Sequence, residues 1–232
     1  MREDNLTVGG GGFGHGFWGQ PTSSIDWCEE NYVVSHYIAE FYNTVSSLVI
    51  ALFGLYGAMH WRSIGHEPRF MALWASIICV GIGSALFHGT LLFSMQMMDE
   101  LPMVYAMLVW LYIWIENETE TPRKKYLPAF LAAYGVFWTF VHTYLGFATI
   151  FQIHFGLLVV AGYTFVGRFA FKTQDPRIKW FSVLYVAPFV LAFALWSTER
   201  IFCSSVRPFQ FHAWWHVLSG IRFVGLPALC VA

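Results

Sequence analysis

Charged side chains are scarce in this sequence of 232 residues. Only 12% of its residues are Asp, Glu, Lys or Arg, about half the share found in an ordinary soluble domain. The formal net charge is -1, and no basic patch of the kind that binds nucleic acid is present, so we expect no nucleic-acid partner. Hydrophobic residues make up 57% of the chain, which predicts that lipid surrounds most of the protein.

No cleavable signal peptide is expected from this N-terminus. The stretch from Gly9 to Gly19 is rich in glycine and has no apolar core, so the first apolar span is expected to act as its own insertion signal. We expect residues 1–35 to form a lumenal N-terminal segment. Asn5 begins a glycosylation sequon there, whereas the sequon at Asn117 falls in a loop expected on the cytosolic side.

Apolar stretches of the roughly 20 residues needed to cross a bilayer recur along nearly the whole chain. They lie near residues 36–60, 69–93, 98–116, 125–145, 149–171, 178–198 and 209–230. This pattern predicts an all-α integral membrane protein, a seven-transmembrane helix bundle formed by residues 36–232, with short loops and no internal repeat. Arg222 falls inside the last span, where a charge costs on the order of 2.5–3.5 kcal/mol at the membrane midplane.

The distribution of basic residues predicts the orientation of these spans. Cytosolic loops retain Lys and Arg, and the residues concerned lie in the first, third and fifth loops: Arg62, Arg69, Arg123, Lys124, Lys125, Arg168, Lys172, Arg177 and Lys179. The N-terminus is therefore expected in the lumen or outside the cell, and the C-terminus in the cytosol.

Cysteine is rare, with four residues in the chain. Cys28 and Cys203 fall on the expected lumenal side, where oxidation is permitted, whereas Cys79 lies within a span and Cys230 near the cytosolic end. A disulfide between Cys28 and Cys203 is compatible with this placement, but spacing alone leaves the pairing open.

A group of polar residues interrupts the apolar spans at their lumenal ends. His212 and His216 are four residues apart, so a helix places them one turn apart on one face, as it does Ser84 and His88. Three histidines with one open position are typical of catalytic zinc sites. Asp99 could move protons and Ser84 could hydrogen-bond an oxyanion, which together describe hydrolysis of an amide or ester.

Other readings of these residues remain open at this point. His142 and His154 also fall in the lumenal half of the membrane, so five histidines compete for three ligand positions. Ser84 could simply bond the backbone four residues back, and Asp99 could simply begin a helix.

An acidic loop precedes the first span. Asp26, Glu29 and Asn31, with the main-chain carbonyl of Trp27, offer oxygen ligands, and Glu40 follows in apolar sequence. Hard oxygen ligands suit calcium, although the spacing is not that of an EF-hand and a solvated acidic loop is an equal alternative.

The chain resembles the alkaline ceramidases, seven-helix members of the hydrolase superfamily that contains the adiponectin receptors. The resemblance runs from about Trp18 to Gly220. Its most specific pieces are Gly83-Ser-Ala-Leu-Phe-His-Gly-Thr, Gln96-Met-Met-Asp-Glu-Leu-Pro and Phe211-His-Ala-Trp-Trp-His, with the N-terminal stretch from Trp18 to Tyr32 and Tyr37-Ile-Ala-Glu-Phe-Tyr-Asn-Thr.

This resemblance implies a membrane enzyme of the endoplasmic reticulum or Golgi that hydrolyses the ceramide amide, with membrane lipid around it. By match of motif, zinc falls to His88, His212 and His216, and catalysis to Asp99 and Ser84. Calcium falls to Asp26, Trp27, Glu29, Asn31 and Glu40, and the disulfide to Cys28 and Cys203. The alternatives are a seven-helix lipid receptor without turnover, which would bind ligand without Asp99, and a metal transporter.

Overall fold

The architecture is a bundle of α-helices, seen here in a computed structural model that describes residues 16–60, 67–118 and 126–224. The helices are α1 (Phe41–His60), α2 (Pro68–Thr90), α3 (Phe93–Glu118), α4 (Leu127–Leu145), α5 (Ala148–Lys172), α6 (Pro176–Val206) and α7 (Phe211–Ile221). Short 3-10 turns follow α6 (Arg207–Phe209) and α7 (Arg222–Val224). The described residues contain no β-strand, so the prediction of an all-α fold is confirmed.

Five of these helices are long and apolar enough to cross a membrane: α1, α2, α3, α5 and α6. The expected integral membrane protein is therefore supported. Helix α4 falls outside this group because tyrosines, a tryptophan and His142 lower its hydropathy, and α7 has only 11 residues within the described part of the chain.

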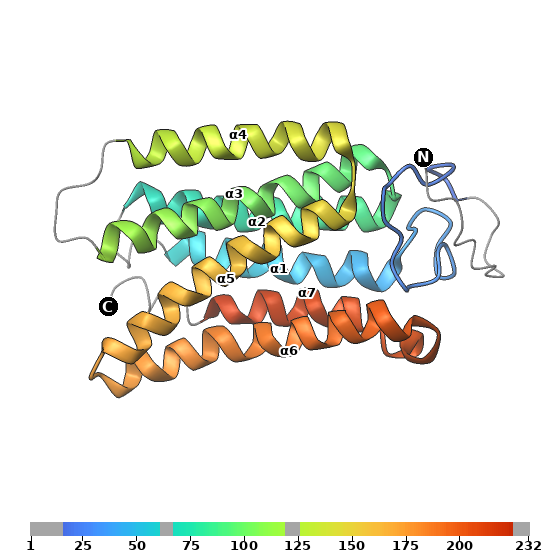
Figure 1. The fold of residues 1–232 in the computed structure, drawn as a ribbon. Coiled ribbons are helices and arrows are strands. Elements are labelled where there is room, and N and C mark those ends of the chain that lie inside the picture. Colours follow the sequence, from blue (N-terminus) through green and yellow to red (C-terminus); the bar gives the residue numbers. More distant parts are fainter. Residues whose placement is uncertain (1–15, 61–66, 119–125, 225–232) are drawn as a thin grey trace.

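The helices run side by side along one direction, and the connections gather at the two ends (Figure 1). Helix α2 packs against both α1 and α3, and α7 packs against α1 and α6. Residues 16–40 cover one end of the bundle, where the α2–α3, α4–α5 and α6–α7 connections also lie (Figure 1). We call this the N-segment end.

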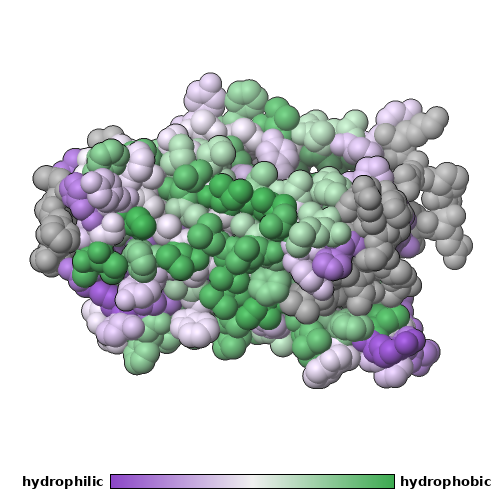
Figure 2. All heavy atoms as spheres, turned by 180° about the vertical axis from the view of Figure 1, so that it is seen from behind, coloured by the Kyte–Doolittle hydropathy of each residue, from purple (hydrophilic) through white to green (hydrophobic). Residues whose placement is uncertain are grey.

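The outer surface fits a lipid environment. Figure 2 shows hydrophobic residues over the middle of the molecule, with more hydrophilic ones toward its two ends. Large apolar side chains such as Phe140, Leu157 and Phe171 are exposed on α4 and α5. In water such exposure would be a liability, whereas in a bilayer it is the expected outer face.

Two glycines allow the central helices to approach closely. A Cβ atom on Gly83 would collide with the backbone carbonyl of Met98 on α3, and one on Gly81 would collide with the backbone of Ala51 on α1. Because only glycine lacks this atom, the two positions let α2 touch both neighbours backbone to backbone. Contact at Gly83 brings the next residue, Ser84, beside α3.

The α2–α3 connection is shorter than predicted. Helix α2 ends at Thr90, and Leu91 adopts a left-handed conformation (φ 52°); α3 then begins at Phe93 rather than near residue 98. The carbonyl of Leu91 accepts hydrogen bonds from the backbone N–H groups of Thr22 and Ser23, both 3.0 Å long. The N-terminal segment is thereby fixed across this turn.

The sixth helix extends beyond the predicted membrane span, which ends near residue 198. Helix α6 continues to Val206, with a kink at Phe202. Glu199, just beyond the predicted span, is buried and its carboxylate accepts the N–H of His212, 2.9 Å away. The helix therefore continues because its glutamate is satisfied by the start of α7.

Some predictions lie outside the described residues: the Asn5 sequon, the basic residues of the first and third loops other than Arg69, Cys230 and the last part of the seventh span. The division into residues 1–35 and 36–232 stays a prediction.

Candidate metal and catalytic site

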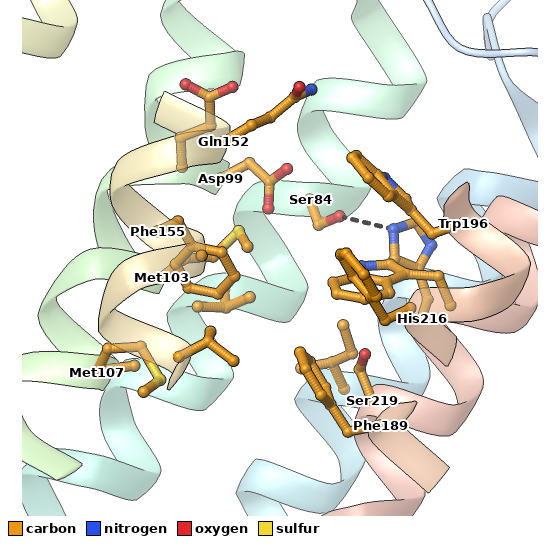
Figure 3. Close-up of a pocket in the computed structure, with 18 of the residues that line it drawn as sticks. Ser84, Asp99, Met103, Met107, Gln152, Phe155, Phe189, Trp196, His216 and Ser219 are labelled. Carbon is orange, nitrogen blue, oxygen red and sulfur yellow. Dashed lines mark hydrogen bonds between the residues drawn. The ribbon is translucent and has the colours of Figure 1, made fainter. Parts of the chain in front are cut away.

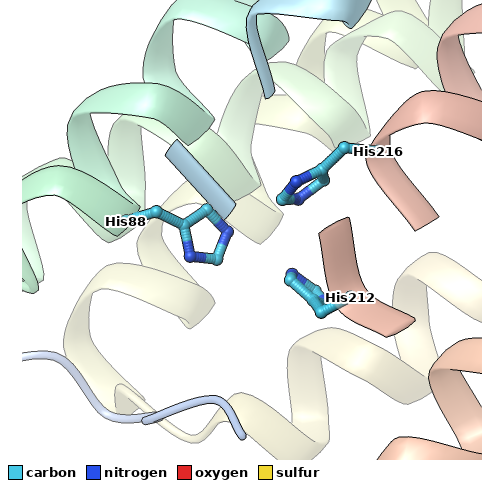
Figure 4. A group of neighbouring side chains, drawn as sticks. All are labelled: His88, His212 and His216. Carbon is cyan, nitrogen blue, oxygen red and sulfur yellow. The ribbon is translucent and has the colours of Figure 1, made fainter. Parts of the chain in front are cut away.

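His88, His212 and His216 form a buried cluster at the N-segment end. One ligand nitrogen from each ring lies within 4.8 Å of the others. His88 comes from the last turns of α2 and the other two from successive turns of α7, and the three rings surround a common space (Figure 4). The structure thus brings together the three histidines that the sequence singled out.

Buried partners orient two of the rings. The Nδ1 atom of His88 forms a hydrogen bond with a carboxylate oxygen of Glu40, and Nδ1 of His216 lies 2.9 Å from the Ser46 hydroxyl oxygen and 3.2 Å from that of Ser47. Nε2 of His88 has no hydrogen-bond partner among the described residues, and Nε2 of His216 has only the Ser84 hydroxyl, 3.5 Å away. Ligating histidines are usually held in this way, through the nitrogen that does not bind metal.

The third ring is held by stacking. The indole of Trp27 lies on His212 with ring centroids 3.8 Å apart, and Nδ1 of His212 is buried with no hydrogen-bond partner among the described residues. An orphaned nitrogen in a cluster of three imidazoles fits a borderline metal such as zinc. The residues present therefore suit a zinc ion.

His142 and His154 are not part of this cluster. His142 Nε2 lies 3.0 Å from His154 Nδ1, and His154 Nε2 lies 2.9 Å from the Tyr134 hydroxyl. Trp138 stacks on His154 with centroids 3.8 Å apart. Because both nitrogens of His154 are engaged on opposite sides of its ring, this pair is a satisfied polar contact between α4 and α5.

Ser84 and Asp99 lie beside the histidines. The Ser84 hydroxyl oxygen is 3.5 Å from His216 Nε2 and 2.9 Å from the Ser47 hydroxyl. The Asp99 carboxyl, from α3, lies next to Ser84 (Figure 3). A hydroxyl, a carboxyl and three imidazoles thus face one space.

That space is the polar end of a cavity of about 550 Å³. Apolar and aromatic side chains such as Met103, Phe155 and Phe189 line its remaining walls (Figure 3). Its shape and lining suit a long apolar molecule with one polar group held near His216.

The acidic loop also contacts this site. Glu40 is fully buried and accepts hydrogen bonds from the Trp27 N–H (3.1 Å) and the Asn43 side-chain amide (3.0 Å), besides contacting His88. Burial and, after it, the nearby Glu40 carboxylate raise the pKa of the Asp26 carboxyl to about 7. Carboxyl groups that burial and mutual repulsion disfavour as anions are stabilised by a cation.

Asn31 supplies a second indication for a cation. Its side-chain N–H group donates to both carboxylate oxygens of Asp26, each at 3.2 Å, while its own carbonyl oxygen is buried and has no hydrogen-bond partner in the described part of the chain. An orphaned amide oxygen beside carboxylates is a suitable ligand set for calcium.

Glu29 has a further role that the sequence did not indicate. Its two oxygens accept the backbone N–H groups of Tyr42 (2.7 Å) and Asn43 (2.9 Å), at the start of α1. Burial raises the pKa of this carboxyl to about 7, while the two N–H groups lower it. Glu29 thus caps a helix, and its role as a calcium ligand stays a prediction.

Cys28 and Cys203 are joined by a disulfide, as the resemblance implied. Glu30 and Arg207 form an ion pair next to it, with N and O atoms 3.8 Å apart. The bond attaches the N-terminal segment to the end of α6, directly before the turn that leads to His212.

Sequence reasoning missed three contributors to the site: Ser46 and Ser47, which hold His216, and Glu199, which holds the first turn of α7. None has a local motif. Ser46 and Ser47 are common polar residues of an apolar helix, and Glu199 acts on a residue 13 positions later. The buried glutamate was the one usable signal, because a charge in an apolar stretch requires a partner.

Comparison with known proteins gives a consistent result. A family model described as Ceramidase matches residues 19–230, a range that includes every residue of the site above. "Alkaline ceramidase 3" of Mus musculus is 35% identical over 221 residues, covering 89% of this chain and 82% of that protein. "Alkaline ceramidase" of Arabidopsis thaliana is 36% identical over 208 residues, covering 87% and 80%, and "Alkaline ceramidase YPC1" of Saccharomyces cerevisiae is 32% identical over 242 residues, covering 89% and 75%.

Proposed function

Because this chain belongs to the ceramidase family and is a ceramide-hydrolysing enzyme, we propose that it cleaves the ceramide amide with the help of a zinc ion held by His88, His212 and His216. The observation that supports this proposal is the buried cluster of their ligand atoms, within 4.8 Å of one another, at the polar end of an otherwise apolar cavity. A bound zinc ion makes water acidic and polarises a carbonyl group.

The residues around the cluster suit the remaining chemistry. Asp99 accepts a proton from the attacking water and returns it to the amide nitrogen as the C–N bond breaks, which gives a fatty acid and a sphingoid base. Ser84 donates a hydrogen bond to the oxygen that becomes negative. Its position 3.5 Å from His216 Nε2 supports this role.

A calcium ion is proposed at Asp26, the Trp27 carbonyl, Glu29, Asn31 and Glu40. Glu40 is the connection between the two metals, because the same carboxylate contacts the zinc ligand His88. Calcium in this position would fix the N-terminal segment and, through Glu40, the orientation of the His88 ring. Its role is therefore structural or regulatory.

Seven membrane spans are proposed, with the N-terminus lumenal and the C-terminus cytosolic, in the endoplasmic reticulum or Golgi. The gathering of residues 16–40 and three inter-helix connections at one end supports a common side for the site. The basic residues near the opposite ends of α5 and α6 (Arg168, Lys172, Arg177 and Lys179) support a cytosolic side there.

The decisive experiment measures fatty acid release from labelled ceramide, together with the zinc content of the detergent-purified protein. His216→Ala is expected to lose zinc and to reduce turnover by about 10³-fold or more, since it removes a ligand of the proposed metal. The matched control is His142→Ala, which alters another buried histidine outside the cluster. This variant is expected to keep both its zinc and its turnover. Turnover that survives both His216→Ala and complete removal of zinc would overturn the proposal.

A further inference from the structure

Gln152 is an isolated polar group in an apolar wall. Helix α5 forms one side of the cavity, and among its cavity-lining residues Gln152 alone has a side chain that can form hydrogen bonds. The α6 side of the same cavity is lined by the aromatic residues Phe189, Phe193 and Trp196. Gln152 follows Phe151, which belongs to the buried core, so its position on the helix is fixed by packing.

The Gln152 amide forms no hydrogen bond with any residue that the structure describes. The nearby polar groups of α4 and α5 do not need it, because His142 and His154 bond each other and Tyr134 takes the remaining nitrogen. A carboxamide without a partner in a membrane interior is unfavourable. Helix packing therefore gives no reason for this glutamine, and a bound molecule would.

Its location identifies the part of the molecule it would meet. In Figure 3 Gln152 and Asp99 both lie across the cavity from His216, toward the end at which Ser84 lies. If the scissile amide lies between Asp99 and the histidines, as proposed above, Gln152 faces the atoms next to that amide. The long apolar chains are left to the rest of the cavity.

Ceramide has hydroxyl groups at this point. The carbon that bears the amide nitrogen is flanked on one side by a CH2OH group and on the other by a CHOH group. A hydroxyl both donates and accepts hydrogen bonds, and a carboxamide has one acceptor oxygen and two N–H donors. We propose that the Gln152 side chain binds a hydroxyl of the sphingoid base and so selects hydroxylated ceramides. This inference rests on the proposed position of the amide at Asp99.

The expected effect is one of specificity. A site that offers a hydrogen-bonding group to a substrate hydroxyl rejects an analogue that lacks it, because the protein group is then left unpaired. A site that makes only apolar contacts discriminates much more weakly between a substrate and an analogue without the hydroxyl. Gln152 should therefore change the ratio between substrates more than it changes the rate on any one of them.

The test compares ceramide with two analogues, one lacking the terminal hydroxyl and one lacking the secondary hydroxyl, in the full-length, metal-loaded enzyme. Wild type is expected to prefer ceramide over one analogue by about tenfold or more in kcat/KM. In Gln152→Leu, which is similar in size but apolar, this preference should fall to nearly one, with unchanged or higher activity on that analogue. Activity on the analogue also shows that the variant is folded. If Gln152→Leu keeps the wild-type ratio for both analogues, the inference is wrong.

A binding measurement separates this inference from the catalytic proposal. In the His216→Ala background, ceramide is expected to bind about tenfold or more tightly than the same analogue, and adding Gln152→Leu should remove the difference. The zinc proposal can fail its own test while ceramide still binds more tightly than the analogue and Gln152→Leu removes that difference in affinity. In that case the proposed contact between Gln152 and the substrate hydroxyl is still supported. Equal binding of ceramide and both analogues before Gln152→Leu is added would overturn it, even in an active enzyme.

Discussion

Replacing Glu40 with glutamine changes one buried oxygen into an NH2 group and leaves the size of the side chain unchanged. In the wild type, one oxygen of Glu40 accepts from the Trp27 N–H at 3.1 Å. The other accepts from the Asn43 amide at 3.0 Å and contacts His88 Nδ1. Both oxygens thus face donors, and the side chain is fully buried.

Neither orientation of the new amide can satisfy these partners. If the NH2 group faces Trp27, two donors oppose each other there. If the NH2 group faces Asn43, two donors oppose each other at that position. The same NH2 group then donates to Nδ1 of His88. The proton of the His88 ring therefore moves to Nε2, where it blocks metal binding. Each buried unsatisfied donor costs about 1–3 kcal/mol, and loss of a ligand-orienting contact typically weakens metal affinity about 10- to 100-fold.

The assay is zinc affinity, measured by competition with a chelator in calcium-containing buffer, together with thermal unfolding. Glu40→Gln is expected to lower the zinc affinity by about 10- to 100-fold and to lower stability. The comparison variant is Asp26→Asn, which alters the acidic loop without touching His88 and should change the calcium requirement but not zinc affinity at saturating calcium. Wild-type zinc affinity in Glu40→Gln would refute the reasoning.

Three further predictions concern residues other than the proposed metal ligands. Gly83→Val forces α2 away from α3, so the free energy of unfolding should fall by about 1–3 kcal/mol. Because Ser84 then shifts away from Asp99, kcat should fall by about 10²-fold. A variant with wild-type kcat and melting temperature contradicts this prediction. Glu199→Ala removes the carboxylate that holds the His212 N–H, so the unfolding free energy should drop by about 0.5–2 kcal/mol and zinc should dissociate faster in a chelator assay, whereas an unchanged rate contradicts the role. Cys28→Ser opens a disulfide spanning 175 residues, so stability in denaturant should fall by about 2–5 kcal/mol, and a reductant should affect wild type but not the variant.

The sequence predicted those parts of the site that depend on local geometry. His212 and His216 were recognised because a helix places residues four apart on one face, and His88 with Asp99 because the expected topology put both at the same end. The family resemblance then chose among the five histidines. In the structure the three chosen histidines lie together, whereas His142 and His154 bond one another; their role as zinc ligands stays a prediction.

The missed features all depend on contacts between distant segments. The start of α3 at Phe93 and the end of α6 at Val206 lie beyond the predicted spans, because hydropathy marks apolar stretches and not the ends of helices. Arg222 is a similar case. Its expected cost is offset by a hydrogen bond to the Tyr163 hydroxyl (2.7 Å) and by the rings of Phe189 and Phe223, each 4.7 Å from the guanidinium. Ring faces attract a desolvated cation, but hydropathy does not report such partners.

The contacts that orient the site are distributed unevenly along the molecule. The triad takes its orientation from the N-segment end: Glu40 holds His88, Trp27 covers His212, and the disulfide fixes Cys28 to the end of α6 just before α7. Much of the apolar wall of the cavity comes instead from α3, α5 and α6, at residues such as Met103, Phe155 and Phe189 that make none of these polar contacts. Damage to the N-terminal segment should therefore release zinc and stop hydrolysis while the bundle stays folded and still binds lipid. The two losses would coincide only if the segment were part of the main folding core. Its buried residues Ile25, Tyr32 and Ala39 pack instead with Phe87 and Leu91 at the end of α2, in a cluster separate from the main core of the bundle.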